Sequence, residues 1–125
     1  MTDRYANFVR FLHTRAGDAV RTAFRYSNTD WEALYLRGDV ETAELRESVT
    51  SIMERLRADQ PIVAHDEYQQ IGEPQASVQI YEEGVLVHIW ESDTHGVAIS
   101  LDVEVAKNLS EFVDQCAEAL NDTQS

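Results

Sequence analysis

The histidines are the side chains in this sequence best suited to binding a metal or transferring a proton. Four occur, at His13, His65, His88 and His95. A zinc site needs three or four converging ligands, and these histidines are widely spaced, with neither an HxH nor an HExxH pattern. We therefore predict no metal site. His88 lies in an expected strand and is interpreted as a sheet-face histidine with a hydrogen-bond partner, whereas His65 and His95 should be solvated.

Carboxylates gather near the ends of two expected strands, at Glu82, Glu83, Glu91 and Asp93. Paired carboxyl groups can exchange protons with a substrate or hold a divalent cation. The chain carries 23 acidic residues, however, so such clusters are expected from composition alone. We interpret this cluster as solvated surface.

The nucleophilic side chains lack the sequence context that catalysis requires. Cys116 is the only cysteine, which excludes an intrachain disulfide, and it falls on the apolar stripe of an expected helix. We predict that Cys116 is buried as a small hydrophobic side chain. No serine lies in a GxSxG pattern, and no glycine-rich loop could cradle a phosphate. The sequence thus predicts no catalytic residue and no cofactor, and we predict that the protein is not an enzyme.

The charge balance is strongly acidic. Ten basic residues, nine of them arginine, give a formal net charge of −13. Repulsion within such a chain costs stability in dilute buffer, but molar salt shortens the screening length to about 3 Å. Many carboxylates and a single lysine are typical of proteins from salt-accumulating halophilic archaea; an ordinary acidic cytosolic protein is the alternative. The charge disfavours nucleic acid and anionic membranes as partners.

Positive charge is concentrated at the start of the chain. Residues 1–26 contain five arginines and two aspartates. Arginine pairs with carboxylates through two parallel hydrogen bonds, so this segment favours contacts with acidic groups, within the fold or across a subunit interface. We predict an interface made of four of these arginines and two aromatic residues that a sheet face could expose. The predicted interface residues are Arg4, Arg10, Arg21, Arg25, Tyr81 and Trp90.

Periodicity predicts the elements that position these residues. A first helix should end at Gly17, and a second should span about 41–58. Alternating patterns predict five strands, at 19–26, 31–37, 75–82, 85–91 and 97–101. Asp102 is the expected N-cap of a last helix with the clearest apolar stripe: Val105, Leu109, Phe112, Val113, Cys116 and Leu120.

The order of elements is α-β-β-α-β-β-β-α. It predicts an α+β fold with an antiparallel sheet of about five strands. We expect one domain over 1–121, a frayed tail over 122–125, and helices that share one face of the sheet. Tyr81 or Trp90 would then stay partly exposed on the other face, as in surfaces used for association.

Two resemblances follow. The order of elements is similar, in topology alone, to the roadblock-like and profilin-like folds, which implies a scaffold or regulatory role. The segments DWEALYLRGDVE (30–41), SVQIYEEGVLVHIW (77–90) and HGVAISLDVEVAKNLSEFVDQC (95–116) resemble a family of small uncharacterised haloarchaeal proteins. That resemblance covers nearly the whole chain and implies no activity.

Together, these patterns favour a non-enzymatic protein-interaction module, with a protein partner or a homodimer formed through sheet edges or a helix-free sheet face. The alternative is a regulatory domain that binds a small ligand between the sheet and the irregular segment 61–74. No signal peptide and no membrane-spanning run is recognisable. The sequence therefore predicts a cytoplasmic protein without a membrane partner.

Overall fold

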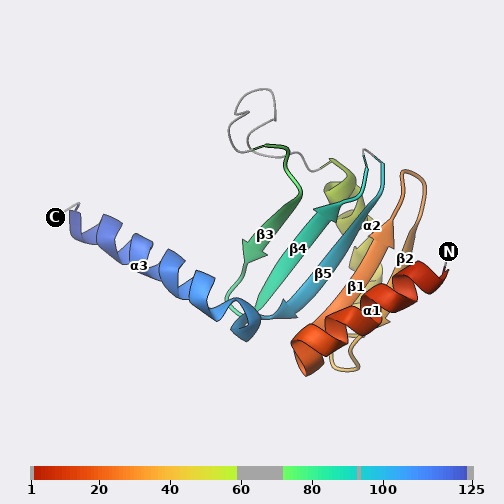
Figure 1. Ribbon diagram of the computed structural model, residues 1–125, viewed down its shortest axis with the longest axis horizontal. Helices are drawn as coiled ribbons and strands as arrows, with labels where there is room; N and C mark the ends of the chain where they lie inside the picture. Colours follow the sequence, from red (N-terminus) through yellow and green to blue (C-terminus); the bar gives the residue numbers. More distant parts are fainter. Residues whose placement is uncertain (1, 59–71, 93, 124–125) are drawn as a thin grey trace.

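The computed structural model describes residues 2–58, 72–92 and 94–123. It contains a five-stranded antiparallel sheet with one helix on each face and a third helix that leaves the sheet (Figure 1). The elements are α1 (Thr2–Ala16), η1 (Gly17–Ala19), β1 (Val20–Tyr26), β2 (Trp31–Leu36), α2 (Ala43–Ala58), β3 (Ala76–Ile80), β4 (Gly84–Trp90), β5 (Gly96–Asp102), η3 (Val103–Ala106) and α3 (Lys107–Thr123). The α+β class and the order of elements are confirmed.

The strand order is β2-β1-β5-β4-β3. Gly17 adopts φ +57°, a left-handed conformation that favours glycine, and α1 ends at the residue before it, as predicted. The predicted β3–β4 turn also forms, one residue earlier than Glu83-Gly84: Gly84 begins β4, and the Tyr81 N–H donates to the Gly84 carbonyl at 2.7 Å. Local turn chemistry therefore defines both the first helix and the β3–β4 hairpin.

The helices cover opposite faces of the sheet, so the prediction that they share one face is wrong. On one face, α2 buries Val49, Met53 and Leu56 against Phe24 and Tyr26 of β1. On the other face, α1 packs over a second cluster of buried residues: Leu12, Val20, Ala23, Val97 and Ile99. Because the central strands carry apolar side chains on both faces, each face needs a cover.

Helix α3 extends away from the sheet (Figure 1). Leu109 is 48% exposed and Leu120 is 63% exposed, and Cys116 is exposed as well. The predicted burial of Cys116 is therefore wrong. The predicted helix forms, but Leu109 and Leu120 of its apolar stripe are exposed, because after η3 the helix runs away from the sheet (Figure 1).

Asp102 does not cap α3. It precedes η3, and its side chain makes no capping hydrogen bond. Its carboxylate instead accepts two hydrogen bonds from Arg37, at 2.9 and 3.1 Å, and one from Arg21, at 3.4 Å. Arg37 also donates to the Asp18 carbonyl at 2.7 Å. This network joins the ends of β1, β2 and β5, and the hydrogen bonds from Arg37 hold the pKa of Asp102 below its usual range.

We expect Asp102→Asn to destabilise the protein at neutral pH by about 1 kcal/mol, because a neutral amide pairs poorly with two arginines. A carboxylate whose pKa is lowered by folding contributes stability above its unfolded pKa of about 3.9, and that stability is lost as pH falls through the lower, folded value. The difference between the wild type and Asp102→Asn should therefore shrink below about pH 4. Urea unfolding of both proteins at several pH values measures this difference in the free energy of unfolding.

Asp114→Asn is the matched control, because it removes the same charge from the exposed surface of α3. It should leave stability unchanged within about 0.5 kcal/mol. A loss of equal size in both variants, or a difference that does not depend on pH, would contradict a specific role for the Asp102 network.

Candidate functional site

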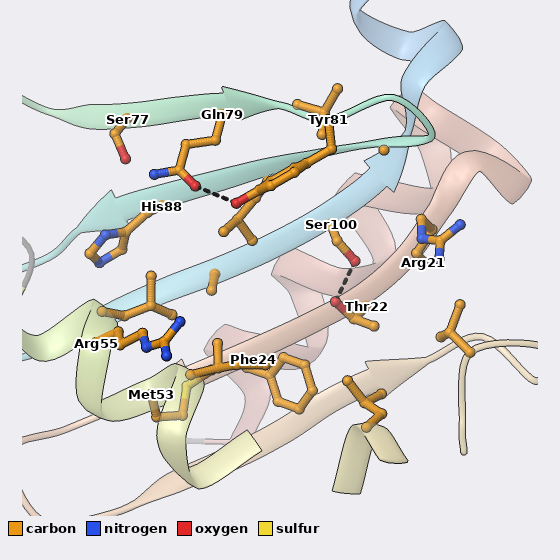
Figure 2. Close-up of a pocket in the computed structure, with 18 of the residues that line it drawn as sticks. Arg21, Thr22, Phe24, Met53, Arg55, Ser77, Gln79, Tyr81, His88 and Ser100 are labelled. Atoms are coloured by element: carbon orange, nitrogen blue, oxygen red, sulfur yellow. Dashed lines mark hydrogen bonds between the residues drawn. The ribbon is translucent and has the colours of Figure 1, made fainter. Parts of the chain in front are cut away.

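An open groove with a volume of about 1020 Å³ lies on the sheet face that carries α2 (Figure 2). Phe24, Met53, Leu86 and Ala98 are among the apolar residues that line it. Ser77, Gln79, Tyr81, Ser100 and Arg55 supply polar groups around that apolar surface. Such a combination suits a ligand with a large apolar surface and a few hydrogen-bonding groups.

Several of the polar groups in the groove bond to one another. The hydroxyls of Thr22 and Ser100 lie 2.6 Å apart, and the Tyr81 hydroxyl donates to Gln79 Oε1 at 2.7 Å (Figure 2). A nucleophilic serine needs a base that accepts its proton, and the partner of Ser100 is another hydroxyl. Neighbouring side chains therefore hold the Ser100 and Tyr81 hydroxyls in place.

His88 lies beneath this groove and is only 1% exposed. Its Nε2 atom is 2.6 Å from the Tyr26 hydroxyl, and its ring contacts Trp90 with centroids 4.9 Å apart. The interpretation of His88 as a sheet-face histidine with a hydrogen-bond partner is confirmed. Because the Tyr26 ring passes directly over Gly96, this buried pair requires glycine at that position.

The other residues considered for chemistry are dispersed. His95 is exposed and bonds within its own turn, to Ser92 and Thr94. Glu91 forms an ion pair with Arg4. His65 and Asp93 lie outside the described residues. Across residues 2–58, 72–92 and 94–123, no three His, Cys, Asp or Glu side chains converge as metal ligands would.

The predicted interface arginines pair mainly within the fold. Arg25 donates to Glu32 at 2.9 Å and to Asp30 at 3.4 Å, Arg21 reaches Asp102, and Arg4 pairs with Glu91. Arg10 donates to Asn7 on the same helix at 3.1 Å. The sequence predicts that these arginines pair with carboxylates either within the fold or across a subunit interface. The contacts show pairing within the fold.

The two predicted aromatic residues lie near opposite ends of β4. Tyr81, at the β3–β4 turn, is 57% exposed and borders the groove. Trp90 is half-buried, and its backbone N–H donates to the Gln75 carbonyl at 3.3 Å. Of the six predicted interface residues, Arg21 and Tyr81 therefore line the same groove (Figure 2), whereas Trp90 lies at the other end of β4.

A second surface lies on the α1 side of the sheet. Cross-strand pairing puts Ala76 opposite Ile89, Val78 opposite Val87 and Ile80 opposite Val85, which gives β3 and β4 one apolar side. Helix α1 packs mainly over β1 and β2, and Val78 is 48% exposed. We call the exposed and half-buried members of this surface the β3–β4 apolar face: Ala76, Val78, Ile80, Val87 and Ile89.

This face continues toward the last helix. A hollow of about 620 Å³ is lined by Val78 and Val87 on one side and by Val105 and Leu109 on the other. Sequence reasoning did not find this face. The signal was present in residues 85–90, where apolar side chains occupy both the odd and the even positions.

The architecture and these surfaces define a three-layer α+β domain built around an antiparallel sheet, with a mixed groove on one face and an exposed apolar area on the other. The chain belongs to the family described as domain of unknown function DUF7522, whose family model matches residues 6–121. No curated protein matches the chain. None of the helices in its described part has the length and apolarity needed to cross a membrane.

Proposed function

We propose that this chain is a non-enzymatic protein-interaction module whose contact surface is the apolar side of α3. The observation that carries the proposal is the exposure of Leu109, Cys116 and Leu120, which we call the α3 stripe. These residues are spaced i, i+7 and i+11, so they lie on one side of the helix. An exposed apolar helix side next to an exposed apolar sheet face is typical of a surface that binds another protein.

The contacts of the polar groups support binding rather than catalysis. The buried histidine bonds to a tyrosine, the groove serine bonds to a threonine, and most of the predicted interface arginines are neutralised by carboxylates within the chain. The resemblance to roadblock-like and profilin-like modules, which serve as scaffolds or regulators, remains a prediction in line with this role.

The test replaces the stripe without altering charge. Leu109→Gln with Leu120→Gln should abolish binding of protein partners, whether these are other copies of the chain or other proteins. The control, Glu111→Gln with Glu118→Gln, places the same two glutamines on the opposite side of the same helix; it also removes two negative charges, whose effect molar KCl screens. Capture from native cell extract in molar KCl, together with light scattering, measures binding, and circular dichroism verifies the helix content. Unchanged binding in the stripe variant would refute the proposal.

The alternative is a domain that binds a small ligand in the groove on the α2 side, which has the volume and mixed lining of a ligand site. Mass spectrometry of small molecules retained by the captured protein tests it, and a protein that retains none would remove this alternative. The predicted contribution of segment 61–74 lies almost entirely outside the described residues. The halophilic origin and the cytoplasmic location remain proposals based on the charge of −13.

A further inference from the structure

The β3–β4 apolar face and the α3 stripe are two exposed apolar surfaces within one chain. On the sheet, Val78 is 48% exposed, at the middle of β3. On the helix, Leu109 and Leu120 are 48% and 63% exposed. Exposed apolar surface favours burial at roughly 25 cal/mol for each Å² removed from water. In the described part of one chain, both surfaces therefore remain partly exposed to water.

The two surfaces match in length. Helix α3 has 17 residues and is therefore about 25 Å long, at a rise of about 1.5 Å per residue. Strand β4 has seven residues and spans about 23 Å, at about 3.3 Å per residue. One α3 can therefore cover the β3–β4 apolar face from end to end, alongside α1.

Charge distinguishes this docking from the pairing of two α3 helices. The sequence of α3 contains four carboxylates and one lysine. That of α1 contains one aspartate and three arginines, of which Arg4 pairs with Glu91, so α1 keeps a small positive excess. Two α3 helices packed together would bring like net charges close to each other. An α3 docked beside α1 places opposite net charges on one face, which favours association. The charges thus favour the sheet face, rather than another α3, as the partner of the α3 stripe.

Leu109 borders the hollow beside Val78 and Val87 of its own chain, but the rest of α3 runs away from its own sheet (Figure 1), so it is placed to reach a second molecule. We propose that two copies of this chain exchange α3, so that the α3 stripe of each copy covers the β3–β4 apolar face of the other, beside α1. The inference rests on the proposed function and names its partner as a second copy. Each copy gives a helix and receives one, which closes a two-fold dimer.

Cys116 provides a direct test, because it is the only cysteine and is exposed near the middle of α3. A tagged chain with Val78→Cys and Cys116→Ser is mixed with the native chain in molar KCl under mild oxidation. Only a contact between two molecules can then form a disulfide between positions 116 and 78. Both positions are central in their elements, so the crosslink does not depend on the direction of the docked helix.

The matched control carries Gln79→Cys and Cys116→Ser, since Gln79 is also exposed and belongs to the same strand but lines the groove on the opposite face. We expect a covalent heterodimer several-fold more abundant for position 78 than for position 79. Light scattering of the native chain should give twice the 14.2 kDa of one chain. The Leu109→Gln, Leu120→Gln variant should be monomeric and should not crosslink.

Three results would overturn the exchange. The first is a native chain that is monomeric at all concentrations. The second is a crosslink between two Cys116 residues without one to position 78, which would indicate paired α3 helices. The third combines two observations: a Val78→Cys chain that keeps Cys116 forms an intrachain disulfide, and the mixing experiment gives no heterodimer. That result would indicate that α3 folds back onto its own sheet. If the native chain captures a protein other than itself, and the Leu109→Gln, Leu120→Gln variant fails to capture it, the proposed function stands. In that case only the exchange of α3 between two copies is refuted.

Discussion

In molar KCl this protein should unfold at a temperature at least about 10 °C higher than in dilute buffer, equivalent to about 3 kcal/mol for a domain of this size. The cause is the net charge of −13, whose self-repulsion acts over a screening length that falls from about 30 Å at 10 mM salt to about 3 Å at 1 M. Thermal melts followed by circular dichroism measure the effect.

Ion pairs inside the fold act in the opposite direction. Pairs such as Arg25 with Glu32 lose attraction as salt rises, but partly exposed pairs contribute only about 0–1 kcal/mol each. Repulsion among the excess carboxylates is therefore expected to dominate. A neutral osmolyte of equal water activity is the control, and it should raise the midpoint much less than KCl. Equal midpoints in dilute and molar KCl would contradict the electrostatic argument and the halophilic interpretation with it.

Gly96→Ala should destabilise the fold by about 1–3 kcal/mol, the range for inserting an atom into a packed core. A Cβ atom at position 96 would lie 2.6 Å from Cζ and 2.8 Å from Cε2 of the Tyr26 ring. Tyr26 is only 4% exposed and its hydroxyl bonds to buried His88, so the ring cannot move aside without breaking that pair. Urea unfolding measures the loss of stability.

Gly38→Ala is the matched control, because a Cβ atom there meets no atom within 4 Å. It should change stability by less than about 1 kcal/mol. If Gly96→Ala were as stable as the wild type, the Tyr26–His88 pair would not be a fixed part of the core.

Local patterns were sufficient to predict much of the fold. The alternation in β1 predicts Val20, Thr22, Phe24 and Tyr26 as one row, and all four are buried. Val20 nevertheless packs in the cluster under α1, on the face opposite Phe24 and Tyr26, because the register shifts between Val20 and Thr22. Gly17 ends α1, and the β3–β4 turn forms within one residue of the predicted Glu83-Gly84, because both features depend on residues close in sequence. Amphipathic periodicity likewise placed α2 and α3.

Contacts between distant residues were not predictable from spacing. Arg37 and Asp102 are 65 residues apart, and only the sheet order brings them together. Periodicity shows that α3 has an apolar side, but not what covers that side, so the prediction of a buried Cys116 failed. The groove forms between α2 and the β3–β4 hairpin, which meet only in the folded sheet.

The position of β5 at the centre of the sheet has a consequence for biosynthesis. Strand β5 lies between β1 and β4, yet it is the last strand in the sequence. While the ribosome is still making residues before 96, β1 and β4 each lack the neighbour that will join them, and the two hairpins cannot form one sheet. The nascent chain therefore exposes two open strand edges until residue 102 has left the exit tunnel, and during that interval it is most open to pairing with the wrong strand.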